Sequence, residues 1–243
     1  MNATALSSDD QRKSPIGRTE GDTETASAAP ALRLKLTEIF LSIQGEANAV
    51  GWPTVFVRLT GCPLRCQYCD TAYAFQGGEW FTIESVLERV KTHGARHVCV
   101  TGGEPLAQKN CIPLLQALCD AGYRVSLETS GAIDIANVDS RVSRVVDVKT
   151  PDSKESHRNR LEDLALLRAD EQIKFVICSR ADFDWSRDLV LNRRLHEKCT
   201  VFFSPSYRQV EPRDLAQWIL DEHLPVRLQV QLHKYLWGDA PGR

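Results

Sequence analysis

Three cysteines lie within eight residues of the chain, at Cys62, Cys66 and Cys69. Their spacing is C-x3-C-x2-C, and soft thiolates on one short loop favour zinc or an iron–sulfur cluster. A closed zinc site needs four ligands, and no fourth Cys or His lies close by in the sequence. Three thiolates on a four-iron cluster instead leave one iron open to a substrate or cofactor. The spacing therefore favours an open iron–sulfur site, with a zinc site completed by a distant ligand, or unligated thiols, as the alternatives.

The remaining cysteines fit no ligand spacing. An even number of cysteines in a short secreted chain would suggest disulfides, but this chain shows no export signal and is long enough to build a core without them. We expect reduced, buried thiols, with a second cluster as the less favoured alternative. These residues are Cys99, Cys111, Cys119, Cys178 and Cys199.

Alternating strands and helices must position the cysteine loop. Short apolar runs predict strands, and apolar residues at helical spacing predict helices. The predicted strands are 55–59, 97–100, 124–128, 145–148, 173–178, 200–203 and 226–232, and the predicted helices are 82–91, 111–121, 161–169, 184–196 and 212–222. Such alternation implies an α/β fold with parallel strands joined by right-handed crossovers. Seven or so strands favour a partial or modified (β/α) barrel in a single domain.

Polar motifs follow the predicted strands, where barrels of this kind gather their active sites. The cysteine loop follows the first of these strands, and Thr101-Gly102-Gly103-Glu104-Pro105 follows the second. The others are 128–131, 149–151 and 204–206, with Gln231, His233 and Lys234 closing the last strand. We therefore expect all six segments to meet in one site.

The C-x3-C-x2-C spacing resembles the signature of the radical S-adenosylmethionine (SAM) enzymes, and 102–105 resembles their GGEP motif. The two motifs stand about one βα unit apart, and this pairing makes the resemblance specific. It implies a barrel of the radical SAM type and a [4Fe-4S] cluster held by Cys62, Cys66 and Cys69. The open iron of that cluster binds SAM, and reduction cleaves SAM to a 5′-deoxyadenosyl radical.

Further motifs resemble one branch of that family, the 7-carboxy-7-deazaguanine synthases of queuosine and 7-deazapurine biosynthesis. They include the triplet 44–46 (QGE), Arg58 four residues before the first cysteine, 128–131 (ETSG) and 231–236 (QLHKYL). The likeness covers most of residues 34–238. It implies a Mg²⁺-dependent ring contraction of 6-carboxy-5,6,7,8-tetrahydropterin to 7-carboxy-7-deazaguanine, with loss of ammonia. Ala47 stands where a glycine is commoner, and we expect it to be tolerated unless that position needs a positive φ.

The chemistry of a carboxylated pterin fits these residues. Glu46 and Gln44 can pair with the donors and acceptors of the pterin edge, and Arg58 can bind a carboxylate with two parallel hydrogen bonds. His233 and Lys234 can contact the substrate or act in proton transfer. We expect Glu46, Arg58 and His233 to be catalytic. The predicted substrate-binding residues are Ile43, Gln44, Gly45, Glu46, Arg58, Thr101, Gln231, His233 and Lys234.

The resemblance also assigns the cofactors. It implies that Gly103 and Glu104 hold the amino group of SAM, that Ser130 contacts its carboxylate or its ribose, that Lys149 acts on its carboxylate end, and that 204–207 flanks the adenine. The predicted SAM-binding residues are Tyr68, Cys69, Asp70, Gly103, Glu104, Ser130, Lys149, Ser204 and Pro205. The hydroxyl of Thr71 resembles the family's protein ligand to Mg²⁺, an ion that needs few protein ligands.

Length and charge limit the remaining possibilities. The 243 residues suit one domain, and we expect a disordered tail at 1–31 and the catalytic domain at 32–243. Residues 1–30 hold three basic and five acidic residues and so carry the whole net charge of −2. The balanced remainder argues against a nucleic-acid surface. No apolar run approaches the ~20 residues that span a bilayer, so we expect no membrane partner and a cytoplasmic protein.

The resemblance implies a homodimer and an electron donor such as flavodoxin or ferredoxin. Two rival functions stay open. A glycyl-radical activating enzyme would use the same cluster on a protein partner, but it would have no need of Gln44, Glu46 and Arg58. A zinc-stabilised binding module would have no activity at all.

Overall fold

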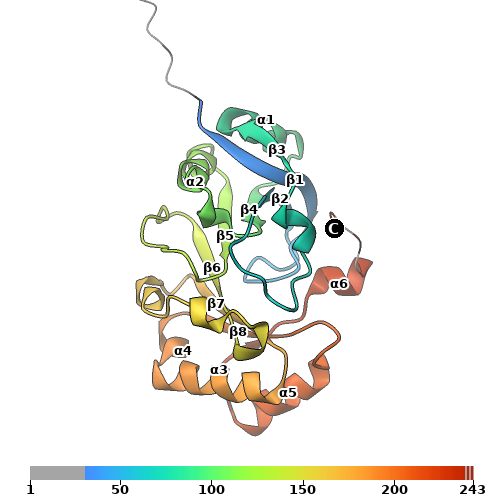
Figure 1. The fold of residues 1–243 in the computed structure, drawn as a ribbon, viewed down its shortest axis with the longest axis vertical. Helices are drawn as coiled ribbons and strands as arrows, with labels where there is room; N and C mark the ends of the chain where they lie inside the picture. The colour runs from blue at the N-terminus through green and yellow to red at the C-terminus, as the bar shows by residue number, and fades with distance from the viewer. Residues whose placement is uncertain (1–30, 239, 241, 243) are drawn as a thin grey trace, which may run out of the picture. The chain divides into compact units, whose positions relative to one another are not determined.

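The computed structural model describes residues 31–238, 240 and 242, and nine strands among them form one mixed sheet (Figure 1). The strand order is β3-β1-β2-β4-β5-β6-β7-β8-β9. The strands are β1 (Arg33–Ile43), β2 (Pro53–Leu59), β3 (Glu79–Thr82), β4 (His97–Gly102), β5 (Arg124–Thr129), β6 (Ser143–Val148), β7 (Gln172–Ile177), β8 (Thr200–Pro205) and β9 (Arg227–Leu228). The helices are α1 (Ile83–Thr92), α2 (Cys111–Asp120), α3 (Arg180–Asn192), α4 (Leu195–Lys198), α5 (Pro212–Asp221) and α6 (Leu232–Trp237).

The sheet is a partial barrel, as the sequence predicts. Strands β2, β4, β5, β6, β7, β8 and β9 are parallel neighbours in this order. Strand β1 is antiparallel to both β2 and β3. Within the described residues no ladder joins β9 to β3, so the barrel stays open between these two edge strands.

Side chains alternate between the two faces of the parallel strands. In β2, the side chains of Val55, Val57 and Leu59 are fully buried in the hydrophobic core. The intervening Phe56 and Arg58 instead line a cavity. One face of the sheet therefore packs on the helices, and the other is available for a site.

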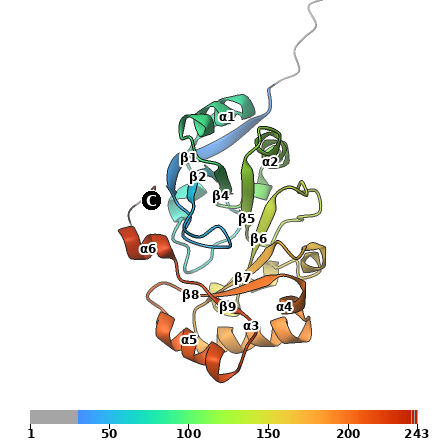
Figure 2. The same ribbon diagram turned by 180° about the vertical axis from the view of Figure 1, so that it is seen from behind.

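The helices cover the outer face of the sheet (Figures 1 and 2). Apolar residues of α1, α2, α3 and α5 join those of the strands in one core. The start of α1 follows the expected capping pattern, because the Thr82 hydroxyl accepts the Ser85 N–H at 3.2 Å. The short α6 lies apart from these helices, beside β1, and its first N–H, from Leu232, donates to the Gly45 carbonyl at 3.1 Å.

Two predicted elements are wrong. The predicted helix 161–169 is only a single 3₁₀ turn, Asp163–Leu166. The buried side chain of Arg144 occupies a carbonyl that a longer helix would use, because its Nη2 donates to the Leu166 carbonyl at 2.8 Å. The predicted strand 226–232 shrinks to β9, because the chain leaves the sheet to reach Gly45. Gln231, His233 and Lys234 therefore lie at the start of α6 rather than at the end of a strand.

One strand is not among those predicted, and one helix differs from expectation at both ends. Strand β1 is absent from the predicted strands, although its buried Leu34 and Leu36 follow the alternation of a strand. Helix α3 begins four residues before the predicted position of 184, because the Ser179 hydroxyl caps it by accepting the Asp182 N–H at 3.2 Å. It ends before Arg194, whose φ of 51° is incompatible with a continuing right-handed helix.

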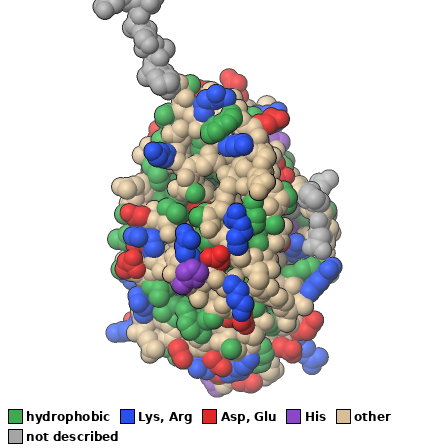
Figure 3. Space-filling model, in the orientation of Figure 1, with side chains coloured by type: hydrophobic (Ala, Val, Ile, Leu, Met, Phe, Trp, Pro, Cys, Tyr) green, Lys and Arg blue, Asp and Glu red, His purple; other side chains and the backbone are tan. Residues whose placement is uncertain are grey.

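Residues Ala31–Arg243 form one compact unit, and the tail predicted at 1–31 lies, apart from Ala31, outside the described residues. Basic and acidic side chains are interspersed over the face of the molecule shown in Figure 3. None of the described helices is both long and apolar enough to cross a membrane.

Candidate active site

A cavity of about 360 Å³ lies on the inner face of the partial barrel. The parallel strands from β2 to β8 each point at least one polar side chain into it. These side chains are Arg58, Thr101, Glu128, Asp147, Lys174 and Ser204. The cavity wall is completed by the cysteine loop, by the segment around Glu46 and by the start of α6.

The cavity brings together most of the residues that the sequence singles out. Its lining includes the predicted substrate-binding residues Ile43, Gln44, Glu46, Arg58, Thr101, Gln231, His233 and Lys234. It also includes Tyr68, Cys69, Asp70, Gly103, Ser130, Lys149, Ser204 and Pro205 of the predicted SAM set, and Cys62, Cys66 and Thr71 of the metal set. Two predicted residues, Gly45 and Glu104, do not line the cavity.

Gly45 and Glu104 support the lining from behind. A Cβ at Gly45 would lie 2.2 Å from Nδ1 of His233, so only glycine allows this close approach. The fully buried carboxylate of Glu104 accepts hydrogen bonds from the backbone N–H of Ser130 at 2.7 Å, the Ser130 hydroxyl at 2.5 Å and the Thr129 hydroxyl at 2.9 Å. It also accepts the Leu106 N–H at 3.0 Å. The Glu104 side chain therefore fixes Ser130 at the cavity wall.

The three cysteines of the loop face one cavity as free, half-buried thiols. Burial raises the pKa of all three, that of Cys66 to about 11. Thiolates here need a nearby positive charge, which a bound metal centre supplies when it displaces the protons. Among the described residues, no group of three His, Cys, Asp or Glu side chains is arranged to hold a single metal ion. The donor set fits an iron–sulfur cluster, whose thiolate ligands bind different iron atoms.

The two glycines of the GGEP segment pack on this loop. A Cβ at Gly103 would lie 2.1 Å from the Gly61 carbonyl oxygen and 2.9 Å from Cβ of Cys62. Gly102 has a φ of 145°, and a Cβ there would meet the Leu59 carbonyl oxygen at 2.2 Å. The backbone of the β4 end thus lies directly against the cysteine loop.

The remaining five cysteines form no disulfide. Cys99, Cys111 and Cys199 are buried, whereas Cys119 and Cys178 are only partly so. Cys178 lies beside the cysteine loop, since its Sγ accepts a hydrogen bond from Nε2 of Gln67 at 3.7 Å.

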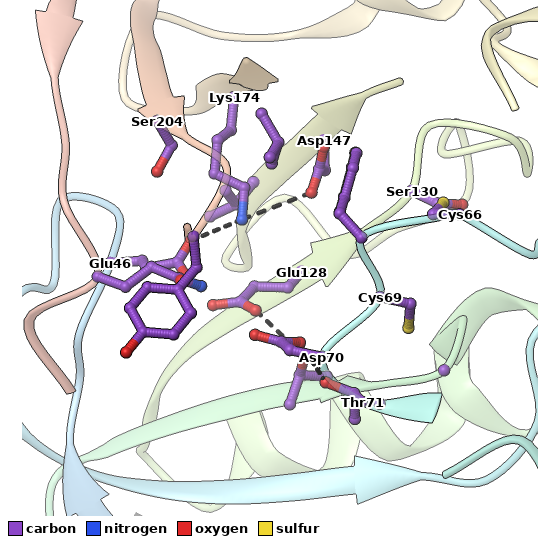
Figure 4. Close-up of a pocket in the computed structure, with 18 of the residues that line it drawn as sticks. Glu46, Cys66, Cys69, Asp70, Thr71, Glu128, Ser130, Asp147, Lys174 and Ser204 are labelled. Carbon is purple, nitrogen blue, oxygen red and sulfur yellow. Dashed lines mark hydrogen bonds and ion pairs between the residues drawn. The ribbon is translucent and has the colours of Figure 1, made fainter. Parts of the chain in front are cut away.

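Four alternating charges cross the floor of the cavity. Lys149 Nζ lies 3.1 Å from Asp147 Oδ2, and the same oxygen lies 3.5 Å from Lys174 Nζ. Lys174 Nζ in turn lies 2.6 Å from Glu46 Oε2 (Figure 4). Burial alone would raise the pKa of Glu46, but the Lys174 ammonium and its hydrogen bond hold that pKa below the ordinary value. The carboxylate of Glu46 therefore stays ionised inside the protein.

Glu128 forms a second acidic group beside this row. The Thr101 hydroxyl donates to Oε2 of Glu128 at 3.1 Å, and Nε2 of Gln44 approaches Oε1 at 3.4 Å. The sequence assigns no role to Glu128, Asp147 or Lys174, although each is a charged residue inside or at the end of an apolar strand. That pattern, a charge at a position where the strand alternates inward, is the signal that could have found them.

Arg58 is held from one side only. Its Nε donates to Glu38 Oε1 at 2.7 Å, and the Tyr73 hydroxyl donates to the same oxygen at 2.7 Å. The guanidinium carbon lies 5.8 Å from the ring centroid of Phe40 and 5.9 Å from that of Tyr73. The two Nη groups of Arg58 have no hydrogen-bond partner among the described residues, so the fork that recognises a carboxylate is available to a ligand.

Thr71 and Asp70 provide oxygen atoms at the cavity edge. The Thr71 hydroxyl donates to Oδ1 of Asp70 at 2.8 Å (Figure 4). Lys234 Nζ lies 3.8 Å from Asp70 Oδ2. Burial would raise the pKa of Asp70, but the Thr71 hydrogen bond and the Lys234 charge hold it below the ordinary value. A hydroxyl beside an ionised carboxylate is a fitting donor set for a hard cation such as Mg²⁺.

Tyr68 has an unsatisfied group at the cavity wall. Its hydroxyl is buried and has no hydrogen-bond partner within the described residues, and burial raises its pKa. Lys149 Nζ lies 5.6 Å from the centroid of the Tyr68 ring. A buried polar atom without a partner is costly to the folded state.

The chain matches the family described as the radical SAM superfamily over residues 56–152. A 7-carboxy-7-deazaguanine synthase of Chlorobaculum tepidum is 45% identical, over 86% of this chain and 97% of that protein. The enzyme of that name from Thermoplasma acidophilum is 37% identical, over 85% and 99%. The crystal structure of QueE from Escherichia coli superposes with a TM-score of 0.69 at 23% identity, covering 83% of this chain and 95% of that one.

Proposed function

The chain belongs to the 7-carboxy-7-deazaguanine synthases of the radical SAM superfamily, and we propose that it converts 6-carboxy-5,6,7,8-tetrahydropterin to 7-carboxy-7-deazaguanine with loss of ammonia. The reaction is a ring contraction in the biosynthesis of queuosine and other 7-deazapurines. One observation carries the proposal most directly. The thiols of the cysteine loop share one cavity with the residues suited to a carboxylated pterin, Gln44, Glu46 and Arg58.

The cofactors of the superfamily are a [4Fe-4S] cluster and SAM, and Cys62, Cys66 and Cys69 are positioned to hold the cluster. When bound, these groups supply a 5′-deoxyadenosyl radical that abstracts a hydrogen atom from the substrate. The backbone at Gly103 lies against the cysteine loop and offers polar groups to the amino end of SAM. Ser130, fixed by Glu104, and Lys149 reach its carboxylate end. Further contacts to SAM come from Tyr68, Asp70, Ser204 and Pro205, all of which line the cavity.

The substrate lies between Arg58 and Glu46. The Nη fork of Arg58 binds the substrate carboxylate, and the rings of Phe40 and Tyr73 lie close to the guanidinium group. Glu46 accepts hydrogen bonds from adjacent N–H groups of the pterin edge, and Gln44 pairs beside it. The remaining contacts come from Ile43, Gly45, Thr101, Gln231 and Lys234. His233 packs on Gly45 and moves protons at the cavity edge.

The hydroxyl of Thr71 binds Mg²⁺, with substrate and water oxygens as the other ligands. Asp70 next to it adds negative charge that favours the ion. We further propose a cytoplasmic homodimer that takes its electrons from a flavodoxin or a ferredoxin.

Anaerobic turnover tests the function. The reconstituted protein is mixed with a reductant, SAM, Mg²⁺ and 6-carboxytetrahydropterin, and mass spectrometry follows the product that has lost ammonia. Formation of that product supports both substrate and reaction. Cleavage of SAM without that product keeps the radical chemistry and rejects the substrate. Zinc without iron and sulfide in an anaerobic preparation rejects both.

A matched variant separates this reaction from that of a glycyl-radical activating enzyme. Glu46→Ala removes a carboxylate that only a small substrate needs, so turnover of the pterin falls while uncoupled SAM cleavage persists. Unchanged pterin turnover in Glu46→Ala would reject the assignment of the substrate edge.

A further inference from the structure

Lys174 is a buried charge that the assigned functions leave unexplained. It lies in β7, whose flanking residues Ile173 and Phe175 are fully buried in the core, yet its own side chain turns inward and lines the cavity. Only 11% of the side chain is exposed. Burying an ammonium costs several kcal/mol unless it is paired, and an apolar residue would stabilise the strand better. Stability of the strand therefore does not explain this lysine, and a functional role at the cavity does.

The ammonium of Lys174 is fixed between two carboxylates from different elements. Its Nζ lies 2.6 Å from Glu46 Oε2 and 3.5 Å from Asp147 Oδ2 (Figure 4). Asp147 is itself held by Lys149 at 3.1 Å. Lys174 is the only residue that forms an ion pair with Glu46 among the described part of the chain. The position of the Glu46 carboxylate thus depends on this single contact and on one neutral donor.

That neutral donor completes the orientation. Nε2 of Gln231 donates to Glu46 Oε1 at 2.8 Å, so each carboxylate oxygen is held by one fixed partner. The backbone N–H of Glu46 donates to Oε1 of Gln44 at 3.2 Å and fixes the residue itself. Each carboxylate oxygen accepts two hydrogen bonds, so one acceptor position per oxygen remains open to a ligand. Two open positions side by side match the adjacent N–H groups of a flat aminopyrimidinone edge.

We propose that Lys174 is a positioning residue for substrate recognition: it holds Glu46 ionised and oriented so that both carboxylate oxygens accept from the aminopyrimidinone edge of the substrate. The inference rests on the proposed function, in which Glu46 contacts that edge. Lys174 acts through Glu46, and Asp147 keeps the ammonium from shifting toward the ligand.

Removing the positive charge has a specific electrostatic consequence. The groups that act on Glu46 are Lys174 from β7 and Gln231 and His233 from the α6 segment. Behind them, Asp147 from β6 faces Lys174, and Glu128 from β5 faces Gln44. The pKa of Glu46 lies below its ordinary value because Lys174 opposes the effect of burial, so without Lys174 burial raises that pKa. A protonated Glu46 presents an O–H donor at one of the two open positions and can no longer accept there from an N–H of the substrate. Substrate affinity in Lys174→Met should therefore fall as the pH is lowered and recover as it is raised.

Equilibrium binding tests this. Anaerobic, cluster-loaded protein with SAM but no reductant is titrated with 6-carboxytetrahydropterin between about pH 6 and about pH 9, around the range in which a buried carboxyl titrates. We expect Lys174→Met to bind at least about tenfold more weakly at neutral pH and to regain affinity at high pH. Lys174→Arg keeps the cation and should follow the wild-type pH profile. Lys91→Met on α1 is the matched control, and Lys174→Gln replaces Lys174→Met if that variant does not fold.

Glu46→Gln distinguishes the positioning role of Lys174 from the proposed contact between Glu46 and the substrate. This variant should bind weakly at every pH, and adding Lys174→Met to it should cause no further loss, because the lysine acts through the carboxylate. If Lys174→Met binds like the wild type, or is weakened equally at every pH, Lys174 has no positioning role. If Glu46→Gln binds like the wild type, the proposed contact of Glu46 with substrate is wrong instead. SAM affinity and the cluster absorbance, measured in parallel, detect general damage to the site.

Discussion

Ala47 shows how a single residue can be tolerated where glycine is expected. Its φ is 62°, in the left-handed region that costs an L-residue roughly 1–2 kcal/mol. Its methyl group is almost fully buried, at 3% exposure, which contributes roughly 0.8 kcal/mol. The extra chain entropy of a glycine costs a further 0.5–1 kcal/mol or so. The backbone strain at Ala47 is therefore similar in size to the sum of the two effects that favour alanine, burial of its methyl group and its lower chain entropy.

We therefore expect Ala47→Gly to change the free energy of unfolding by less than about 1 kcal/mol. Ala47→Val should destabilise the protein by more than that, since a β-branched residue fits the left-handed region poorly and the site has no room. Thermal unfolding of the reconstituted protein distinguishes the two variants. Equal losses for both would mean that the methyl group, rather than the backbone, determines stability here.

Glu38 determines how Arg58 meets a carboxylate. Because Glu38 holds Nε at 2.7 Å, its removal lets the guanidinium rotate. We expect Glu38→Ala to weaken binding of 6-carboxytetrahydropterin by about tenfold. Tetrahydropterin without the carboxyl group should bind with little change. Glu38→Gln keeps an acceptor and should lose less, and Glu84→Ala on α1 serves as the control. A uniform loss for both ligands would indicate damage to the cavity rather than loss of carboxylate recognition.

At the scale of elements, the sequence predicts the strands that end in motifs and misses the segments whose course depends on distant contacts. Strands β2, β4, β5, β6, β7 and β8 appear as apolar runs, so the site residues at their ends could be placed. The turn Asp163–Leu166 could not be predicted, because the Arg144 side chain that binds the Leu166 carbonyl comes from β6. The α6 segment could not either, since its anchor is the carbonyl of Gly45, far away in the sequence.

The same limit applies to the charges of the site. A lysine inside an apolar strand is visible in the sequence, but its partners Glu46 and Asp147 lie on a loop and on another strand. Local patterns identify chemistry-bearing residues, and only the fold shows which of them meet. For this reason the sequence could single out Lys174 as a charge inside an apolar strand, but it could not predict that Lys174 pairs with Glu46.

The contact between β4 and the cysteine loop yields a prediction at this scale. Gly103→Ala would place a Cβ 2.1 Å from a backbone oxygen, at Gly61, and backbone cannot move aside as a flexible side chain can. We expect this variant to assemble little cluster, measured as iron and sulfide per protein after anaerobic reconstitution. Gly94→Ala is the control, since its φ of 67° brings strain while no atom lies within 4 Å of the added Cβ. Full cluster content in Gly103→Ala would show that the loop adapts.

At the scale of the whole molecule, one sheet separates an apolar core from a charged cavity. The outer face of the strands and the helices share an apolar core, whereas the inner face gathers ionised groups in a cavity. The ions balance locally, since Lys149, Asp147, Lys174 and Glu46 alternate in sign. Paired charges of this kind avoid most of the cost of burying a single ion, so the cavity can be highly polar without unfolding the barrel.

The same separation distinguishes the cysteines that line the cavity from those in the apolar core, and it predicts how each kind responds to substitution. Cys62, Cys66 and Cys69 line the cavity, whereas Cys111 is fully buried in α2 as part of the apolar core. Replacing any of the three loop cysteines by alanine should abolish the cluster and its visible absorbance, because three thiolates are the minimum set here. Cys111→Ala should keep the cluster and lower stability by about 1 kcal/mol, the value of a small apolar group. Loss of cluster in Cys111→Ala, with the fold intact by circular dichroism, would mean that the ligand set extends beyond the loop.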